Sequence, residues 1–327
     1  MKRIGGFYIQ NVSNMTVDGL TFKYCTNGPV GYGPLPNYLT VYGMKIALGK
    51  DIMIVDCSFE DSVATALGVF YSNLHLHGNS FTNNGHSSGS YEKWGTRIFT
   101  NTNTLLTTAK IMAIYSGGIT AKNSTPNFTG NSTFRNNFVE YAGGIYAYNS
   151  SLNFTGNTIF IDNSAEFGGG MKAMNSFLNF TGNIIFRNNS ATVGGGIDAS
   201  NSSLTFMGNQ TFTTNLAQHG GGIHAFRSTL SFVGKGTFGN NLAVLSGGGI
   251  KTFLSALSFT GSTSFTNNSA VHGGEIHKLH STLNIARKSI PGNGGGIKAM
   301  NSTLDFTENI TFRNNSARFG GGIEKAV

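Results

Sequence analysis

Charged residues are scarce in this sequence, in which Asp, Glu, Lys and Arg together make up 11% of the chain. A disordered chain would carry more charge and less apolar surface, whereas this one holds 26 Phe. Its two cysteines, Cys25 and Cys57, are too few for a disulfide framework, and we expect buried thiols. No apolar run approaches the roughly 18 residues of a membrane helix, so we expect no transmembrane segment in this chain. The abundance of Phe, Ile and Thr instead favours strands.

Basic residues outnumber acidic ones by 22 to 14, which gives a formal net charge of +8. The Lys and Arg residues are scattered and form no basic run, so we expect no nucleic-acid partner. A basic surface still favours acidic polysaccharides or anionic membranes.

Asn-x-Ser/Thr sequons are dense along the chain. They begin at Asn11, Asn14, Asn123, Asn127, Asn131, Asn149, Asn153, Asn179, Asn188, Asn201, Asn209, Asn267, Asn301, Asn309 and Asn314. Because such sequons are glycan acceptors in secreted proteins, they favour an extracellular or cell-surface location. The opening residues 1–6 are followed by no apolar signal segment, so we expect the signal to lie upstream in a longer chain.

An internal repeat dominates the rest of the sequence. The phrase Gly-Gly-x-Ile, or its shorter form Gly-Gly-Ile, recurs, and intervals of 26, 26, 26, 26, 27, 26, 21 and 26 residues separate its apolar position. That position is occupied by Ile119, Ile145, Met171, Ile197, Ile223, Ile250, Ile276, Ile297 and Ile323. A fixed period of this length is typical of solenoid proteins.

Each period contains three short segments in which apolar and polar residues alternate, and Gly, Asn and Ser separate these segments. Alternation predicts strands, and the separating residues predict turns. Three strands in about 26 residues form one coil, or rung, of a parallel β-helix. We therefore predict an all-β chain, a single right-handed parallel β-helix spanning 1–327.

Equivalent residues of successive rungs are expected to stack about 4.8 Å apart. One predicted inward stack contains Phe134, Phe160, Phe186, Phe212, Phe238, Phe265 and Phe312. Three positions later, a predicted hydrogen-bonded ladder contains Asn137, Asn163, Asn189, Asn215, Asn241, Asn268 and Asn315. Small residues form a third inward column, at Ala121, Ala147, Ala173, Ala199, Ala225 and Ala299.

The repeat is regular over 117–327 and looser over 1–116, where we predict loop insertions near 28–38 and 86–110. One late rung is short, and there we expect Ile290 to replace the Phe, Asn293 to take the ladder position and a kink to form near 286–294. The last rung carries no polar cap, so we expect a fragment of a longer chain with flanking rungs as its neighbours.

The combination of glycine pairs with Phe-x-x-Asn resembles the repeats of chlamydial polymorphic outer-membrane proteins. Good copies are Gly169-Gly170-Met171 with Phe186-Arg-Asn-Asn189, and Gly195-Gly196-Ile197 with Phe212-Thr-Thr-Asn215. This resemblance covers about 117–323 and implies the β-helical passenger of a surface adhesin. This chain departs from those repeats in usually carrying a third Gly before the Ile.

Residues 1–110 are more similar to the β-helix of pectate lyases, polygalacturonases and other pectin-lyase-like proteins, which implies polysaccharide cleavage. A hydrolase needs two carboxylates roughly 5–9.5 Å apart. The candidate catalytic residues are Asp56, Glu60 and Asp61. Asp56 aligns with Gly19 and Gly78 of other rungs, so no carboxylate pair stacks, and a solvated turn is the simpler interpretation. A lyase or hydrolase remains the alternative to a structural or adhesive role.

The residue after each repeat Ile defines an outward column of mixed charge. Its candidate ligand-binding members are Tyr146, Lys172, His224, Lys251, His277 and Lys298, and Thr120, Asp198 and Glu324 complete it. This column is suited to an acidic glycan or an extracellular protein ligand, as in a noncatalytic binding module. Alternatively, it only provides solubility, since opposite charges along a stack relieve repulsion. No His or Cys pattern indicates a metal, and no motif indicates a cofactor.

Overall fold

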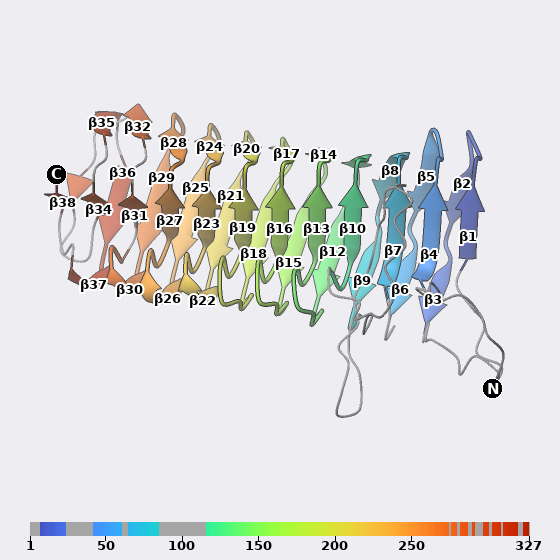
Figure 1. Ribbon diagram of the computed structural model, residues 1–327, viewed down its shortest axis with the longest axis horizontal. Helices are drawn as coiled ribbons and strands as arrows, with labels where there is room; N and C mark the ends of the chain where they lie inside the picture. The colour runs from blue at the N-terminus through green and yellow to red at the C-terminus, as the bar shows by residue number, and fades with distance from the viewer. Residues whose placement is uncertain are drawn as a thin grey trace, which may run out of the picture.

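A computed structural model of the chain describes residues 7–23, 42–60, 65–84, 116–274, 276–279, 282–286, 290–291, 297–300, 303–308, 310–319 and 323–326. Over these residues the chain forms strands and no helix, and the strands wind into one elongated solenoid (Figure 1). The N-terminal rungs lie at one end of the solenoid and the C-terminal rungs at the other. The predicted all-β parallel β-helix is therefore confirmed.

Three long parallel sheets run the length of the solenoid. The first, of 12 strands, contains β1 (Phe7–Gln10), β4 (Tyr42–Ala47), β7 (Thr65–Phe70), β10 (Ile119–Lys122), β13 (Ile145–Tyr148), β16 (Met171–Met174), β19 (Ile197–Ser200), β23 (Ile223–Phe226), β27 (Ile250–Phe253), β31 (Ile276–Leu279), β34 (Ile297–Met300) and β38 (Ile323–Ala326). The second, of 11 strands, contains β2 (Thr16–Asp18), β5 (Ile52–Val55), β8 (Asn73–His77), β11 (Thr125–Phe128), β14 (Ser151–Phe154), β17 (Phe177–Phe180), β20 (Ser203–Phe206), β24 (Thr229–Phe232), β28 (Ala256–Phe259), β32 (Thr282–Ala286) and β35 (Thr303–Glu308).

The third sheet also has 11 strands. In spatial order these are β3 (Thr21–Lys23), β6 (Ser58–Glu60), β9 (Ser80–Thr82), β12 (Ser132–Arg135), β15 (Thr158–Ile161), β18 (Ile184–Arg187), β21 (Gln210–Thr213), β25 (Gly236–Gly239), β29 (Thr263–Thr266), β36 (Ile310–Arg313) and β33 (Ile290–Pro291). In the regular rungs, one strand from each sheet in turn forms the three strands per rung that the sequence predicts.

The rungs repeat in register. Ile145 lies beside Ile119 on one side and Met171 on the other, at the spacing of the sequence repeat. The predicted loops near 28–38 and 86–110 lie outside the described residues. The rungs on either side of the second of them pair directly, with Leu67 beside Ile119 and Phe81 beside Phe134, so the coil continues across that segment.

A fourth sheet was not predicted. It contains β22 (Leu216–His219), β26 (Leu242–Ser246), β30 (Ser269–His272) and β37 (Ser316–Phe319). Isolated bridges extend the same path to earlier rungs, where Val193 bridges both Phe167 and His219. These strands follow the ladder asparagine and precede the glycines, a segment in which the sequence alternation is too short to distinguish a strand from a turn.

The core is built from two phenylalanine stacks rather than the one predicted. The first extends from Phe59 to Phe265, and its described rings lie 4.6–4.9 Å apart. The second extends from Phe128 to Phe259 on the second sheet. The two stacks meet edge to face, as Phe206 does with Phe212. The ring of Phe312 lies outside the described side chains, although its backbone pairs with Phe265.

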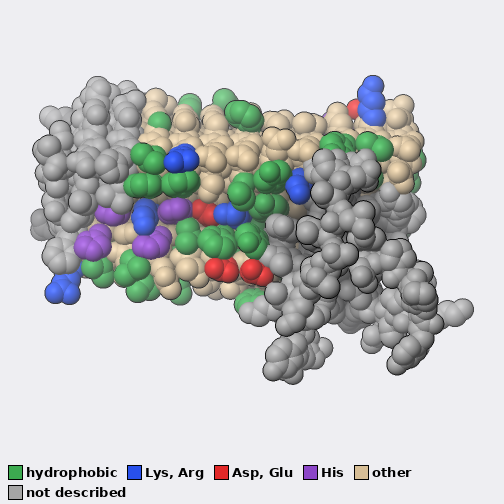
Figure 2. Space-filling view, viewed as in Figure 1, with side chains coloured by type: hydrophobic (Ala, Val, Ile, Leu, Met, Phe, Trp, Pro, Cys, Tyr) green, Lys and Arg blue, Asp and Glu red, His purple; other side chains and the backbone are tan. Residues whose placement is uncertain are grey.

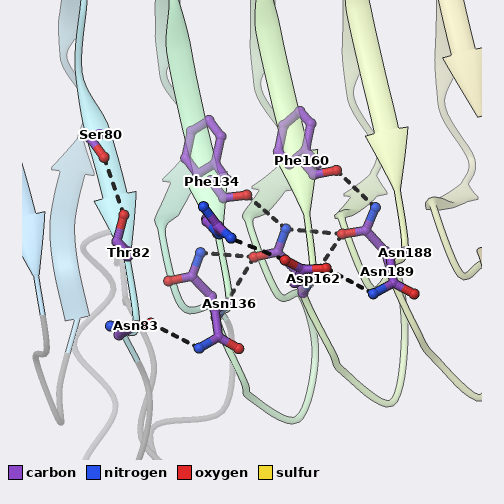
Figure 3. Close-up of polar contacts among 12 residues, drawn as sticks. Ser80, Thr82, Asn83, Phe134, Asn136, Phe160, Asp162, Asn188 and Asn189 are labelled. Carbon is purple, nitrogen blue, oxygen red and sulfur yellow. Dashed lines mark hydrogen bonds and ion pairs between the residues drawn. The ribbon is translucent and has the colours of Figure 1, made fainter.

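The ladder asparagines are buried and join three successive rungs. The Nδ2 of Asn189 donates to the carbonyl of Phe160 in the preceding rung (Figure 3). It also donates to Oδ1 of Asn215 in the next rung. The Oδ1 of Asn189 accepts from both the backbone N and the Nδ2 of Asn163. The same pattern runs from Asn137 to Asn315. Each amide therefore satisfies buried backbone groups where the chain leaves the third sheet.

The short late rung differs from the prediction. Ile290 does not enter the phenylalanine stack, because β36 pairs directly with β29 and β33 lies outside β36. Asn268 likewise donates straight to Asn315, so the ladder bypasses this rung; Asn293 lies outside the described residues. Pro291, which has no N–H, is compatible with this edge position. The kink predicted near 286–294 falls mostly outside the described residues.

Candidate functional site

The predicted acidic cluster lies at the turn between β5 and β6 and along β6. Asp56 is exposed, has a left-handed backbone (φ 47°), and its carboxylate lies against Gly78. Glu60 accepts a hydrogen bond from Ser58 at 2.6 Å. Asp61 lies outside the described residues. Among the described contacts, Asp56 and Glu60 are not joined, so their catalytic role stays a prediction.

The predicted outward column is continuous along the first sheet. Tyr146, Lys172, Asp198, His224, Lys251 and His277 are direct register partners from rung to rung, and we call them the polar stripe. The backbone of Lys298 continues the register beyond His277, but its side chain lies outside the described side chains.

The polar stripe is far less exposed than an outward column should be. Tyr146, Lys172, Asp198 and His277 are only 5%, 6%, 2% and 6% exposed. They are covered by a second column of side chains, which we call the flanking column. It stands at the ends of the fourth-sheet strands and at the equivalent positions of earlier rungs. Its members are Tyr141, Phe167, Val193, His219, Ser246 and His272. The alternative interpretation of the column as a source of solubility therefore does not fit most of its members, and their ligand-binding role stays a prediction.

The third glycine of the repeat forms the turn between the flanking column and the first sheet in most of these rungs. Gly194 has φ +67°, and an added Cβ would lie 2.2 Å from the carbonyl oxygen of Ile197. The glycines at the same position in the other regular rungs also have positive φ, namely Gly168, Gly220, Gly247 and Gly273. Glycine is the residue that adopts this conformation without steric cost. The turn brings the flanking column against the polar stripe.

At the N-terminal end of the stripe the charges neutralise one another. Lys172 Nζ donates to Asp198 Oδ2, and His224 Nδ1 donates to Asp198 Oδ1 at 2.8 Å. Burial raises the pKa of Asp198, but the His224 hydrogen bond and the Lys172 charge outweigh it, so this pKa lies below its usual value. The Lys172 ammonium also lies 4.8 Å from the ring centre of Phe167. These contacts form a buried, self-compensating ion cluster.

The next rung holds a cation without an acidic partner among its described contacts. Lys251 Nζ lies 2.9 Å from His219 Nδ1, which is also 2.9 Å from Ser246 Oγ. Because an ammonium only donates, His219 Nδ1 accepts and the ring is neutral. Burial lowers the pKa of Lys251 to about 8. Burial, then the charges of Lys251 and His224, lower the pKa of His219 to about 4.

Two more histidines extend this region by one rung. The rings of His272 and His277 lie 6.0 Å apart, one on the flanking column and one on the stripe. Figure 2 shows histidine side chains gathered around a basic side chain on this face, next to acidic and basic ones. The sequence identified the stripe histidines, but it gave no signal for His219 and His272 because the fourth sheet was not foreseen.

Within the described residues, no three His, Cys, Asp or Glu side chains are placed to hold a metal ion. The described residues also form no helix that is long and apolar enough to cross a membrane. Cys57 is a buried free thiol whose pKa burial raises, and Cys25 lies outside the described residues.

No protein-family model matches the chain, and no curated protein matches its sequence. Among solved structures, a hyper-glycosylated fragment of TibA, glycosylated by TibC, aligns with 95% of this chain and 99% of that fragment. The two share 13% sequence identity with a TM-score of 0.23, a likeness too distant to support an argument. The resemblances to chlamydial and pectin-lyase-like repeats stay predictions from the sequence.

Proposed function

We propose that this chain is a structural and adhesive β-helix segment of a secreted or cell-surface glycoprotein. The observation that carries the proposal is the position of its sequons. None of the sequon asparagines that the structure describes is buried, and most lie on exposed turns. A solenoid that carries glycans on its turns is a rod whose remaining sheet faces stay free to contact a partner.

Adjacent asparagines at one turn show the contrast. Asn188 is exposed and begins the sequon Asn188-Asn189-Ser190, whereas Asn189 is buried and is followed by Ser190-Ala191. Every described ladder asparagine likewise lacks Ser or Thr two positions later. Acceptor sites therefore fall where a glycan fits without disturbing the core, as expected of a secreted protein.

The test is expression with a secretion signal in a eukaryotic cell, followed by glycan mapping of the secreted protein. We expect occupied sites among Asn131, Asn188, Asn201 and Asn267, which are all exposed. Substitution N188Q should remove one glycan, whereas Q218N, which creates no sequon, serves as the matched control. A secreted, folded protein with no glycan at any sequon would contradict the proposal.

A further inference from the structure

The candidate is the C-terminal half of the polar stripe, where two columns of side chains form a grid three rungs deep. His224, Lys251 and His277 are consecutive register partners on the first sheet. His219, Ser246 and His272 are consecutive partners on the fourth sheet. We call these six residues the histidine grid, and Figure 2 shows its basic side chains on one face.

The grid has a surplus of cationic and protonatable groups. Asp198 is the described acid that faces it, and it already accepts hydrogen bonds from Lys172 and His224. Beyond Asp198 the stripe continues as His224, Lys251 and His277, and in register as Lys298. An anionic ligand would therefore meet the ammonium of Lys251, which has no carboxylate among its described contacts.

At the centre of the grid an ammonium donates to a neutral imidazole. Lys251 Nζ faces His219 Nδ1 at 2.9 Å, and neither is satisfied by a carboxylate in its described contacts. Protonation of His219 would place two positive charges in contact. An oxyanion bound beside them would accept from both and would favour the protonated forms of both. Binding and proton uptake are therefore coupled.

A second, independent feature lies beside the grid. The interval from Ile223 to Ile250 is 27 residues rather than 26. The extra residue produces a register shift in β26, which leaves Val244 and Leu245 56% and 43% exposed. Bulges of this kind are common next to binding sites. Here the bulge adds an apolar surface to a cationic one, a combination that fits a sugar ring carrying an acidic group.

We propose that the histidine grid binds the carboxylate or sulfate groups of an extended anionic polysaccharide, and that it binds them more tightly as the pH falls. The extracellular origin of this ligand rests on the proposed function, whereas the anion site itself does not rest on it. A polymer fits better than a small anion, because Lys251 and histidines that can be protonated occupy successive rungs along a straight column. Charge-assisted hydrogen bonds from Lys251 and the protonated histidines supply the attraction.

The test uses the full chain and isothermal titration calorimetry with three probes: heparin as the sulfated polymer, polygalacturonate as the carboxylated polymer, and neutral dextran. Titrations at about pH 5.5 and about pH 7.5, in two buffers of different ionisation enthalpy, measure affinity and proton uptake together. We expect a polyanion to bind, at least about tenfold more tightly at the lower pH and with net proton uptake. The better of the two anionic probes identifies sulfate or carboxylate as the natural group.

Two variants locate the site. K251Q and H219Q should each weaken polyanion binding by about tenfold or more, as expected for loss of a charge-assisted hydrogen bond. K235Q, at an exposed lysine outside the stripe, is the matched control and should leave affinity unchanged. A cooperative unfolding transition and a parent-like circular dichroism spectrum would show that each variant is folded; if K251Q is not, deletion of Leu245 tests the same site through the bulge.

Absence of polyanion binding at the lower pH would overturn the proposal, as would equal losses in K251Q and K235Q or binding without proton uptake. Glycan mapping is independent of these measurements. A chain that lacks glycans but binds polyanions would refute the proposed location and keep the grid, and the reverse result would refute the grid alone.

Discussion

A single residue with left-handed backbone conformation closes the turn from the first sheet to the second in the regular rungs. Asn occupies this position at Asn123, Asn149, Asn175 and Asn201, with φ of 49–50°. In later rungs the position holds Arg227 and Leu254, at φ 48° and 52°. Asn tolerates this conformation better than a longer or branched side chain does.

Leu254→Asn should therefore stabilise the protein. Leu254 is 41% exposed, so little burial is lost, and the relief of backbone strain should raise the free energy of unfolding by about 0.5–1 kcal/mol. Urea unfolding monitored by circular dichroism measures the change. The reciprocal substitution Asn201→Leu serves as the control and should destabilise by a similar amount; a destabilised Leu254→Asn protein would contradict the argument.

At the same scale, His219 makes stability depend on pH. Its pKa of about 4 lies below the 6.5 of an unperturbed histidine. The unfolded chain therefore binds a proton that the folded chain does not, and stability falls as the pH drops from about 6.5 towards 4. H219Q removes this contribution.

Free energies of unfolding measured from about pH 7.5 to about pH 4.5 should thus fall less steeply for H219Q than for the parent protein. His75→Gln, on the second sheet away from the stripe, is the matched control and should follow the parent. Parallel curves for H219Q and the parent would show that His219 is not held neutral.

Among the individual residues, Lys251 and His277 could be placed on the outward column from the sequence, because the interval of the repeat fixes the face. Their burial could not, because it depends on the contacts of Lys251 with His219 and of His277 with His272, which lie on a sheet that the sequence alternation did not reveal. His219 was missed for the same reason. Its importance arises only from its contact with Lys251 across two sheets.

At the scale of the element, the asparagine ladder holds successive rungs together through buried hydrogen bonds. Asn189→Ala should lower the free energy of unfolding by about 3 kcal/mol or more, since it leaves the carbonyl of Phe160 and buried groups of Asn163 and Asn215 unsatisfied. Asn183→Ala, on an exposed turn, should cost under about 1 kcal/mol. Equal losses in denaturant titrations would show that the ladder adds no stability.

The phenylalanine stack also holds successive rungs together, through ring contacts in the core. Phe212 is fully buried between Phe186 and Phe238, with ring centres 4.9 and 4.8 Å away. Phe212→Ala should lower the free energy of unfolding by about 3–5 kcal/mol, because it removes a buried ring and leaves a cavity. A loss below about 1 kcal/mol would contradict its place in the core.

The stacked features of the core were predictable from the sequence to different extents. The Phe and Asn positions of the regular rungs were predictable because each recurs once per period. The second stack, Phe128 to Phe259, recurs just as regularly, but its edge-to-face contact with the first depends on how the sheets close. The order of β33 and β36 was not predictable, since a missing Phe indicates an irregular rung without indicating where its strand goes.

For the whole molecule, each rung contacts chiefly the rungs on either side of it, so the destabilisation caused by a core substitution should remain local. In Phe212→Ala, amide hydrogen exchange should accelerate in β18, β21 and β25 and stay unchanged in β5 and β8. Exchange measured by mass spectrometry on peptic fragments tests this. Uniform acceleration along the chain would indicate a single cooperative unit instead.

The crossed order of the last strands decides which strand forms the edge of the third sheet. β36 lies between β29 and β33 in space, although β33 comes before it in the sequence. A solenoid that winds strictly from its N-terminus would place β33 on β29 and β36 on β33. Here β36 pairs with β29 instead, and β33 forms the outer edge of the third sheet among the described strands. Pro291 of β33 has no N–H to donate to a further strand, so this edge is a poor template for pairing with another chain.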